Sequence, residues 1–342
     1  MKFDKPAGEN TIDQLKVVGR PHDRIDGPLK TTGTARYAYE WHEEAPNAAY
    51  GYIVGSAIAK GRLTALDTDA AQKAPGVLAV ITASNAGALG KGDKNTARLL
   101  GGPTIEHYHQ AIALVVAETF EQARAAASLV QAHYRRNKGA YSLADEKQAV
   151  NQPPEDTPDK NVGDFDGAFT SAAVKIDATY TTPDQSHMAM EPHASMAVWD
   201  GNKLTLWTSN QMIDWCRTDL AKTLKVPVEN VRIISPYIGG GFGGKLFLRS
   251  DALLAALAAR AVKRPVKVML PRPSIPNTPT PPPPTLRPFL IVAHRGGKTT
   301  PSSHKTRLGK RPGGRPASAI QHSDNPTPGA QIHNGRRRAP PA

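Results

Sequence analysis

The sequence predicts a mixed α+β fold followed by a C-terminal segment of a different kind. In residues 1–270, apolar runs of strand length alternate with turn signals and with segments whose apolar residues recur at helical spacing. A glycine-rich loop at residues 239–244 stands between a strand and a helix of that pattern. The last 72 residues, 271–342, instead hold 16 of the 30 prolines and show no sustained apolar period. Residues 1–270 have the size of one or two domains, and two is the better prediction.

The positive charge is also confined to one end of the chain. The 342 residues carry 43 Lys and Arg against 30 Asp and Glu, a net charge of +13. Residues 271–342 alone hold 12 Lys and Arg and one acid, Asp324, whereas residues 1–270 hold 31 against 29. The basicity is therefore local and does not extend over the globular part.

Cysteine use and hydropathy make four further features unexpected: an internal disulfide, an iron–sulfur cluster, a membrane span and a secretory signal. Cys216, the single cysteine, can neither close a disulfide within the chain nor supply the four thiolates of an iron–sulfur cluster. Any electron relay is therefore expected in another subunit. The longest run of small apolar residues, 252–259, is far shorter than the roughly 18–20 residues that span a bilayer. Residues 1–20 lack the apolar core of a secretory signal.

After an N-terminal arm at residues 1–16, a first unit is predicted at residues 17–140. Its clearest element is an apolar strand at residues 111–116, followed by Thr119 as a helix N-cap and Gln122 as the capping-box partner. The helix is predicted to continue because apolar residues recur at helical spacing: Phe120, Ala123, Ala127, Val130 and Tyr134.

A polar, proline-rich stretch at residues 141–170 is predicted to link this unit to a second one at residues 171–277. The elements expected in the second unit are a strand at 203–209, a helix at 215–224, a strand at 230–238, the glycine loop, a helix at 247–262 and a strand at 265–270. Residues 278–342 cannot bury enough apolar surface to offset their ordering entropy, so disorder is predicted there.

The glycine loop, Gly239 to Lys245, is the strongest local motif. Crowded glycines let backbone N–H groups approach an anion closely, and the following helix offers its positive N-terminus. The spacing also fits nucleotide-binding and dinucleotide-binding loops. However, Leu246 stands where a hydroxyl would bind magnesium, and the predicted strand at 265–270 ends without an acid to hold a ribose. The alternative is a structural turn that allows close packing of helix and sheet.

Two other clusters carry weaker patterns. His187, Glu191 and His193 lie within seven residues and could bind a metal. Pro192 disfavours a continuous helix there, so supporting polar residues are the better interpretation. Residues 336–338, three consecutive arginines, could bind phosphate backbones with the other cations of the tail. Binding of nucleic acid or of an acidic surface through the tail is therefore the alternative from another class of function.

A series of short motifs runs through residues 1–277. These are Val18-Gly19-Arg20-Pro21, Arg24-Ile25-Asp26-Gly27, Lys30-Thr31-Thr32-Gly33, Ala35-Arg36-Tyr37, Ala111 to Ala123, Glu191-Pro192, Thr208-Ser209-Asn210-Gln211 and Gly239 to Lys245. Together they resemble the molybdopterin-binding large subunit of the xanthine dehydrogenase and aldehyde oxidase family, most closely that of bacterial periplasmic aldehyde oxidoreductases. The resemblance implies an α/β hammerhead domain followed by the first part of a molybdenum-cofactor domain.

The resemblance also implies a cofactor and its site. The cofactor would be a molybdopterin, as a cytosine dinucleotide in bacteria, and its dithiolene rather than side chains would hold the molybdenum. Loop amides would lie beside the metal and the pterin, and Gln211 would hydrogen-bond the apical oxo group. The residues implied in cofactor binding are Gln211, Gly240, Gly241, Phe242, Gly243 and Gly244.

The implied reaction oxidises aldehydes to carboxylic acids with oxygen from water. Two electrons would pass to a 2Fe-2S subunit and an FAD subunit of a heterotrimer. N-heterocycles, the substrates of the xanthine dehydrogenase type, are the alternative. Relatives of the periplasmic kind are exported with a signal-bearing partner, so the resemblance implies a periplasmic location, whereas this sequence taken alone indicates the cytoplasm.

The chain also departs from the family pattern. Family members are much longer and place a general-base Glu near the far C-terminus, whereas the last Glu here is Glu229. No catalytic residue is therefore assigned in this chain. The composition after residue 278 suggests a frameshift and a truncated chain that is inactive alone. The hammerhead domain is then expected to fold by itself, while Phe247 and residues 253–257 are expected to lack apolar partners.

Overall fold

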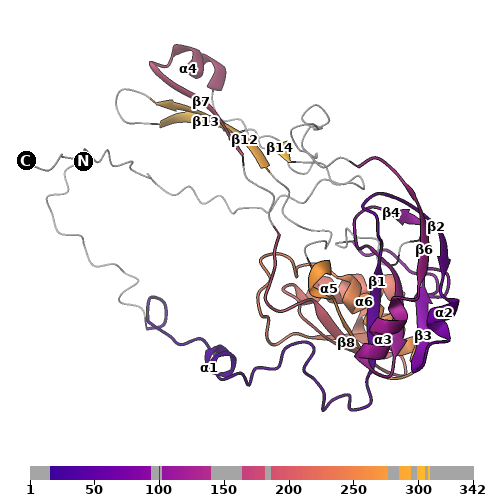
Figure 1. The fold of residues 1–342 in the computed structure, drawn as a ribbon. Coiled ribbons are helices and arrows are strands. Elements are labelled where there is room, and N and C mark those ends of the chain that lie inside the picture. Colours follow the sequence, from indigo (N-terminus) through magenta and orange to yellow (C-terminus); the bar gives the residue numbers. More distant parts are fainter. Residues whose placement is uncertain are drawn as a thin grey trace, which may run out of the picture. The chain divides into compact units, whose positions relative to one another are not determined.

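The computed structural model describes residues 16–93, 100, 102–139, 164–181, 186–275, 285–293, 299–304 and 307–308. The described residues fall into two compact units (Figure 1). One lies within residues 1–142 and 184–282, and the other within residues 143–183 and 283–342.

A mixed seven-stranded sheet forms the centre of the first unit. Two neighbouring pairs are parallel, β10 with β9 and β1 with β11, and the other neighbours are antiparallel. The strands in sheet order are β10 (Val231–Ile234), β9 (Lys203–Thr208), β8 (Ala194–Asp200), β11 (Val266–Met269), β1 (Ala49–Gly55), β5 (Ala111–Ala117) and β3 (Val77–Thr82).

The two units predicted at residues 17–140 and 171–277 therefore share one sheet. Gly51 of β1 aligns with Val268 of β11 on one side and with Val116 of β5 on the other. The close approach requires a glycine, because a Cβ at Gly51 would lie 2.8 Å from a methyl group of Val268. Hydrophobic periodicity identifies strands but does not show which distant strands pair, so the sequence did not reveal this junction.

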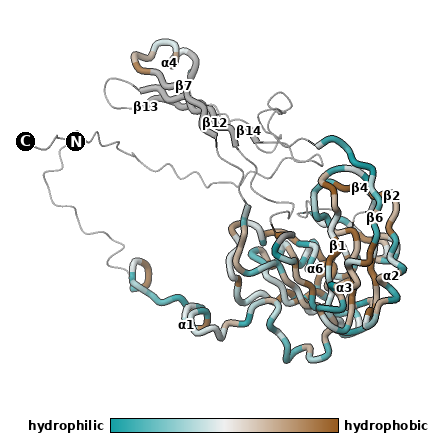
Figure 2. Tube along the Cα trace, viewed as in Figure 1, coloured by the Kyte–Doolittle hydropathy of each residue, from teal (hydrophilic) through white to brown (hydrophobic). Residues whose placement is uncertain are grey.

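Helices cover both faces of the sheet. Leu114 and Val116 of β5 belong to a core that includes α5 (Ile213–Leu224) and α6 (Ser250–Val262). Their neighbours on the opposite face of β5 pack instead with α2 (Asp69–Gln72) and α3 (Phe120–Ala127). Every residue of β5 is buried for this reason. Hydrophobic stretches run through the strands and helices of the first unit (Figure 2).

Helix α3 begins as predicted and ends earlier. The Oγ1 atom of Thr119 accepts from the Gln122 amide at 3.2 Å, and the Oε1 atom of Gln122 accepts from the Thr119 amide at 3.1 Å, which confirms the capping box. The helix stops at Ala127 instead of reaching Tyr134. Tyr134 lies in a strand and packs inward in a second sheet, so a two-residue period prevails over the helical spacing.

Helix α6 is buried almost completely, and its neighbourhood corrects another expectation. Leu253 and Leu254 are 0% exposed and lie in a core with residues of β1, β3 and β5. Phe247, just before the helix, stacks on Trp215 with ring centroids 5.9 Å apart. These side chains therefore have the apolar partners that the sequence predicted to be missing. Cys216 of α5 is also buried, and burial raises the pKa of its thiol, as expected of an inert side chain.

A three-stranded antiparallel sheet completes the first unit. Its order is β4 (Thr104–Ile105), β2 (Gly61–Asp67) and β6 (Gln131–Arg136). One face packs on Ile58 and Ile112. The remaining short elements of the unit are α1 (Gly27–Thr31) and the 3-10 helices η3 (Val228–Asn230) and η4 (Arg272–Ser274). Within the described ranges, every helix is too short or too polar to traverse a bilayer.

The second compact unit contains α4 (Phe165–Ser171) and an antiparallel sheet. In that sheet β12 (Thr285–Ala293) pairs with β7 (Val174–Thr181), β13 (Thr299–His304) and β14 (Arg307–Leu308). These strands differ from the disorder predicted for residues 278–342, because the apolar run that ends β12 is long enough to form a strand. Most of the predicted linker, and residues 309–342 with the three arginines, lie outside the described residues.

Candidate functional site

The loop between β10 and α6 carries a row of backbone donors. Gly240, Phe242 and Gly243 have positive φ angles of 94°, 49° and 82°. In the described part of the chain, no group accepts a hydrogen bond from the backbone N–H groups of Gly240, Gly241, Phe242 or Gly243. Successive amides in a turn with left-handed residues form a concave anion-binding nest. The loop can therefore bind an anion through its backbone.

Gln211 lies against this loop, as the resemblance implied. A Cβ at Gly241 would lie 2.5 Å from the Gln211 carboxamide carbon, so only glycine allows the approach. The Gln211 amide donates to the Lys245 carbonyl at 2.7 Å, and the Lys245 amide donates to Gln211 Oε1 at 3.2 Å. The side-chain NH₂ of exposed Gln211 has no acceptor among the described residues. It is thus a further donor beside the loop.

Two buried side chains contact the C-terminal end of the loop at the Gly244 carbonyl. Arg249 donates to the Gly244 carbonyl from Nε at 2.9 Å and from Nη2 at 2.5 Å. The Nε2 atom of His193 lies 3.1 Å from the same oxygen. Both side chains are buried. The Gly244 carbonyl is therefore directed into the protein, and the Gly244 amide closes the turn by donating to the Gly241 carbonyl at 2.6 Å.

A buried ion pair fixes the other side of the loop. Three donors converge on Glu191 Oε2, each at 2.7 Å: the Gly239 amide, the Ser209 hydroxyl and the Lys245 ammonium. The Lys245 side chain is 0% exposed and also donates to the Glu191 carbonyl at 3.0 Å. Burial lowers the pKa of Lys245, and the Glu191 carboxylate opposes that shift. Through these contacts Glu191, three residues before β8, is joined to both ends of the glycine loop, Gly239 and Lys245.

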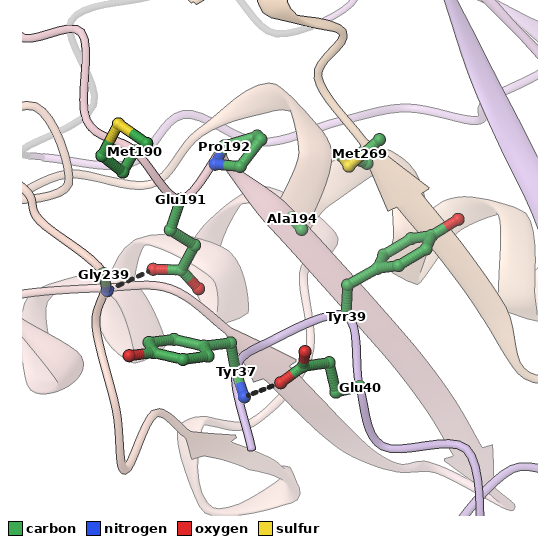
Figure 3. A pocket seen from close by; sticks show the side chains of 9 residues that line it. All are labelled: Tyr37, Tyr39, Glu40, Met190, Glu191, Pro192, Ala194, Gly239 and Met269. Atoms are coloured by element: carbon green, nitrogen blue, oxygen red, sulfur yellow. Dashed lines mark hydrogen bonds between the residues drawn. The ribbon is translucent and has the colours of Figure 1, made fainter. Parts of the chain in front are cut away.

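A pocket of about 380 Å³ lies next to this ion pair (Figure 3). The Glu191 carboxylate projects between the loop and the ring of Tyr37, and the Tyr37 amide donates to Glu40 at 2.8 Å. The residues that line the pocket are Tyr37, Tyr39, Glu40, Met190, Glu191, Pro192, Ala194, Gly239 and Met269. Most of them are apolar or aromatic, so the pocket suits an apolar group beside the loop.

The metal hypothesis for His187, Glu191 and His193 finds no support. Nowhere in the described ranges do three or more His, Cys, Asp or Glu side chains form a set that could hold a metal ion. Instead, Glu191 pairs with Lys245 and His193 supports Gly244. The ring of His187 lies so close to Gly244 that a Cβ there would be 2.8 Å from it. The contacts of Glu191 and His193 are those of polar side chains that support the loop.

Sequence reasoning missed the roles of Arg249 and Asp251. Asp251 is buried in the first turn of α6 and accepts a hydrogen bond from Ser195 at 2.7 Å. Burial raises the pKa of its carboxyl. Their positions in the sequence could have indicated these roles. Both residues stand at the start of the helix that follows the loop, where polar side chains can bind loop carbonyls or helix amides.

Because of His193, the free energy of unfolding is expected to depend on pH. Burial, followed by the positive charge of Arg249, lowers the pKa of His193 to about 3. In the unfolded chain the pKa is near 6.5, so the stability from the neutral ring is complete above about pH 6.5 and is lost as the pH falls toward 3. We expect lowering the pH from 7 to 5 to reduce the free energy of unfolding by about 1–2 kcal/mol through this group.

Urea unfolding at several pH values measures this effect, with His193→Asn as the comparison. The variant is expected to show a flatter slope between pH 7 and pH 5. Equal slopes for the two proteins would contradict the assignment to His193.

Two family models match the chain. The a/b hammerhead domain of aldehyde oxidase and xanthine dehydrogenase matches residues 34–138, and the molybdopterin cofactor-binding domain matches residues 145–278. The second match begins inside the predicted linker at 141–170. The described elements of both segments contribute strands to the seven-stranded sheet.

The curated relatives that match the chain are molybdenum-binding or molybdopterin subunits. The chain is 89% identical over 339 residues to the aldehyde oxidoreductase molybdenum-binding subunit PaoC of Escherichia coli K12. The aligned region covers 99% of this chain and 46% of PaoC. The chain is 29% identical to the nicotinate dehydrogenase large molybdopterin subunit of Eubacterium barkeri, over 74% of this chain and 61% of that protein. The chain thus spans about half the length of these relatives.

Solved structures confirm the fold. The aldehyde oxidoreductase of Desulfovibrio gigas superimposes with a TM-score of 0.68 at 23% identity, covering 81% of this chain and 33% of that one. Quinoline 2-oxidoreductase of Pseudomonas putida 86 gives 0.68 at 22% identity, with coverages of 83% and 38%. The matched cofactor-binding domain identifies the chain as one of the molybdopterin-binding class. With the two matched domains, the chain belongs to the aldehyde oxidase and xanthine dehydrogenase family.

Proposed function

We propose that this chain holds the molybdopterin of an aldehyde oxidoreductase that converts aldehydes to carboxylic acids with oxygen from water. The observation that carries the proposal is the run of four backbone N–H groups, Gly240 to Gly243, that lack acceptors in the described structure. A large anionic cofactor needs such fixed donors. The 89% identity to a subunit named for aldehyde oxidation favours aldehydes as substrates.

The residues present suit this cofactor. Loop amides would bind its anionic groups, with Gly241 and Gly244 giving the backbone room and Phe242 extending from the loop, 73% exposed. Gln211 would donate its free NH₂ to a cofactor oxygen. When bound, the molybdenum cofactor supplies two-electron oxidation and oxygen transfer from water. The cytosine dinucleotide form belongs to this proposal.

The proposal extends to partners and location. The electrons would leave through a 2Fe-2S subunit and an FAD subunit, since the single cysteine here is buried and cannot serve as a relay. The assembly would work in the periplasm. No general base is assigned to this chain: its last Glu, Glu229, lies exposed at η3 rather than beside the glycine loop.

Oxidation of N-heterocycles is the second candidate. It is favoured by the similarity to nicotinate dehydrogenase of Eubacterium barkeri. The apolar pocket beside the loop could accept either an aromatic aldehyde or a flat heterocycle. The higher identity to the aldehyde oxidoreductase subunit places aldehydes first.

A glycine replacement tests the loop as the cofactor site. At Gly243, φ is +82° and the nearest heavy atom to an added Cβ is 3.8 Å away, so Gly243→Ala strains the backbone without a clash. We expect this strain to reorient the loop amides and to weaken binding of isolated molybdopterin cofactor at least tenfold. Fluorescence titration of the purified chain measures the dissociation constant.

Gly201→Ala is the matched control. Gly201 also has a positive φ, +54°, with open space around a Cβ, but it lies in the β8–β9 turn. Both variants are expected to lose about 1 kcal/mol of stability, and only Gly243→Ala is expected to lose affinity. If both bind the cofactor like the unmodified chain, or the unmodified chain binds none, the loop is not the site.

A further inference from the structure

Residues 187–191, which we call the backing segment, lie along one side of the glycine loop. A Cβ added to Gly244 would lie 2.8 Å from the ring of His187, and one added to Gly240 would lie 3.5 Å from the Cβ of Ala189. Ala189 is buried at this contact. The position of the backing segment therefore limits where the backbone of the loop can run.

The conformation of the backing segment is not set by a helix or a sheet, because the segment belongs to no regular element. Among the described residues, residues 188–191 make one backbone–backbone hydrogen bond, from the Glu191 amide to the Gly239 carbonyl at 3.1 Å. Met188 also has a φ angle of +34°, in the left-handed region that residues other than glycine rarely adopt. Side chains from elsewhere in the chain must therefore hold the segment in place.

Two cationic side chains bind three successive carbonyl groups of the backing segment. Arg272 donates from Nη1 to the Ala189 carbonyl at 2.6 Å and from Nη2 to the Met190 carbonyl at 2.5 Å. The Lys245 ammonium donates to the next carbonyl, that of Glu191, at 3.0 Å. A guanidinium group is a planar, rigid fork, so it fixes the directions of two acceptors at once. Arg272 therefore supplies two of the three hydrogen bonds that take the place of a sheet partner here.

Arg272 acts on the backing segment and not on the loop directly. It lies in η4, shortly after β11, and in the described structure it donates no hydrogen bond to the glycine loop. Its positive charge would nevertheless attract an anion bound nearby. Geometry and charge are therefore two ways in which Arg272 could influence anion binding. They can be separated, because salt screens interactions between exposed charges, over a Debye length of about 8 Å at physiological salt, but does not change the geometry of a hydrogen-bonded backbone.

We propose that Arg272 is a positioning residue of the anion-binding loop. By holding the carbonyls of Ala189 and Met190, it keeps the backing segment against the loop. The segment in turn keeps the amides of residues 240–243 in the orientation that binds an anion. The inference rests on the proposed function for the identity of that anion, the molybdopterin cofactor. The geometry itself is tested with a simpler anion, inorganic pyrophosphate, which the same backbone donors can bind.

The test compares Arg272→Lys and Arg272→Met with the unmodified full chain. Lysine keeps the positive charge, but one ammonium group cannot hold two carbonyls in the planar geometry of the guanidinium. Calorimetric titration with inorganic pyrophosphate at 50 and 500 mM salt measures the dissociation constants. Both variants are expected to bind at least about tenfold more weakly than the unmodified chain at either salt concentration, the loss expected when a charge-assisted hydrogen bond is misaligned.

Arg264→Met is the matched control. Arg264 also binds a backbone carbonyl, that of Asn47, from Nε at 3.2 Å and from Nη2 at 2.9 Å, and it pairs with Glu118. In the described structure it donates no hydrogen bond to the backing segment, so this variant is expected to bind pyrophosphate like the unmodified chain. Gly243→Ala is the positive control, because weaker binding by that variant shows that pyrophosphate occupies the loop.

Three results would overturn the inference. If Arg272→Lys binds like the unmodified chain, or if the losses disappear at 500 mM salt, Arg272 acts through its charge alone. An equal loss in Arg264→Met would show a general effect of destabilisation. If Arg272 alters pyrophosphate binding as expected but the chain binds no molybdopterin cofactor, the positioning role stands and the proposed function fails.

Hydrogen exchange provides a second measurement that needs no ligand. It decides the question if the unmodified chain binds no pyrophosphate, or if Gly243→Ala binds it normally. The Gly239 amide donates to Glu191 and the Gly244 amide donates to the Gly241 carbonyl. Faster exchange of these two amides in Arg272→Lys, but not in Arg264→Met, is expected from the positioning role. Exchange as slow as in the unmodified chain would overturn it.

Discussion

Replacing Lys245 with Met is expected to lower the free energy of unfolding by about 3–5 kcal/mol. The substitution removes a fully buried ammonium group and leaves the Glu191 carboxylate, 11% exposed, without its cation. The other carboxylate oxygen, Glu191 Oε1, has no hydrogen-bond partner in the described structure. It therefore offers no second interaction that could stabilise the charge once Lys245 is gone. Urea unfolding of the full chain, followed by tryptophan fluorescence, measures the change.

Two further variants define the cause. Lys222→Met breaks an exposed ion pair with Asp93, in which the lysine side chain is 46% exposed, and is expected to cost less than about 1 kcal/mol. Glu191→Gln combined with Lys245→Met removes the uncompensated charge and is expected to recover part of the stability. A Lys245→Met variant as stable as Lys222→Met would contradict the role given to the buried pair.

Leu254→Ala is expected to destabilise the chain by about 3 kcal/mol or more. Leu254 is 0% exposed in the middle of α6, and truncation would leave a cavity among side chains from several strands. The same urea experiment measures the change. Because the sheet covers the leucines of α6, these side chains do not form the exposed apolar patch that would promote aggregation.

Leu129→Ala is the comparison for this substitution. Leu129 is 43% exposed just after α3, so the same change in side-chain volume is expected to cost less than about 0.5 kcal/mol there. Similar losses at positions 254 and 129 would mean that α6 is not packed as described. That result would instead support the expectation, drawn from the sequence, that residues 253–257 lack apolar partners.

Local features could be predicted from the sequence, whereas distant pairings could not. The capping box at Thr119 and Gln122 involves residues three apart, and its residue types define its hydrogen bonds. The loop glycines and Gln211 were identified through short motifs, and the structure brings them together. The capping box was predicted correctly because neighbouring residues carry its whole signal, whereas binding of a cofactor by the loop glycines and Gln211 stays a prediction.

The support beneath the loop depends on residues far apart in sequence. Glu191 and Lys245 are 54 residues apart, and no period or spacing indicates that they meet. Lys245 was noted only for a nucleotide-loop spacing that Leu246 argues against, and a structural ion pair was not predicted for it. Likewise, the pairing of β1 with β11 follows from tertiary packing, which periodicity does not encode.

The pairing of β1 with β11 constrains the order in which the chain can acquire its structure during synthesis. When a ribosome has made residues 1–140, β1 and β5 exist, but α6 and β11 do not. Leu114 and Val116, which α6 will cover, are then exposed on one face of an unfinished sheet. Domains generally fold as units during translation, and this unit is complete only once Met269 has left the exit tunnel. The hammerhead segment therefore keeps an open apolar face until α6 covers it and an open edge at β1 until β11 pairs there, and both elements are encoded near the far end of the described first unit.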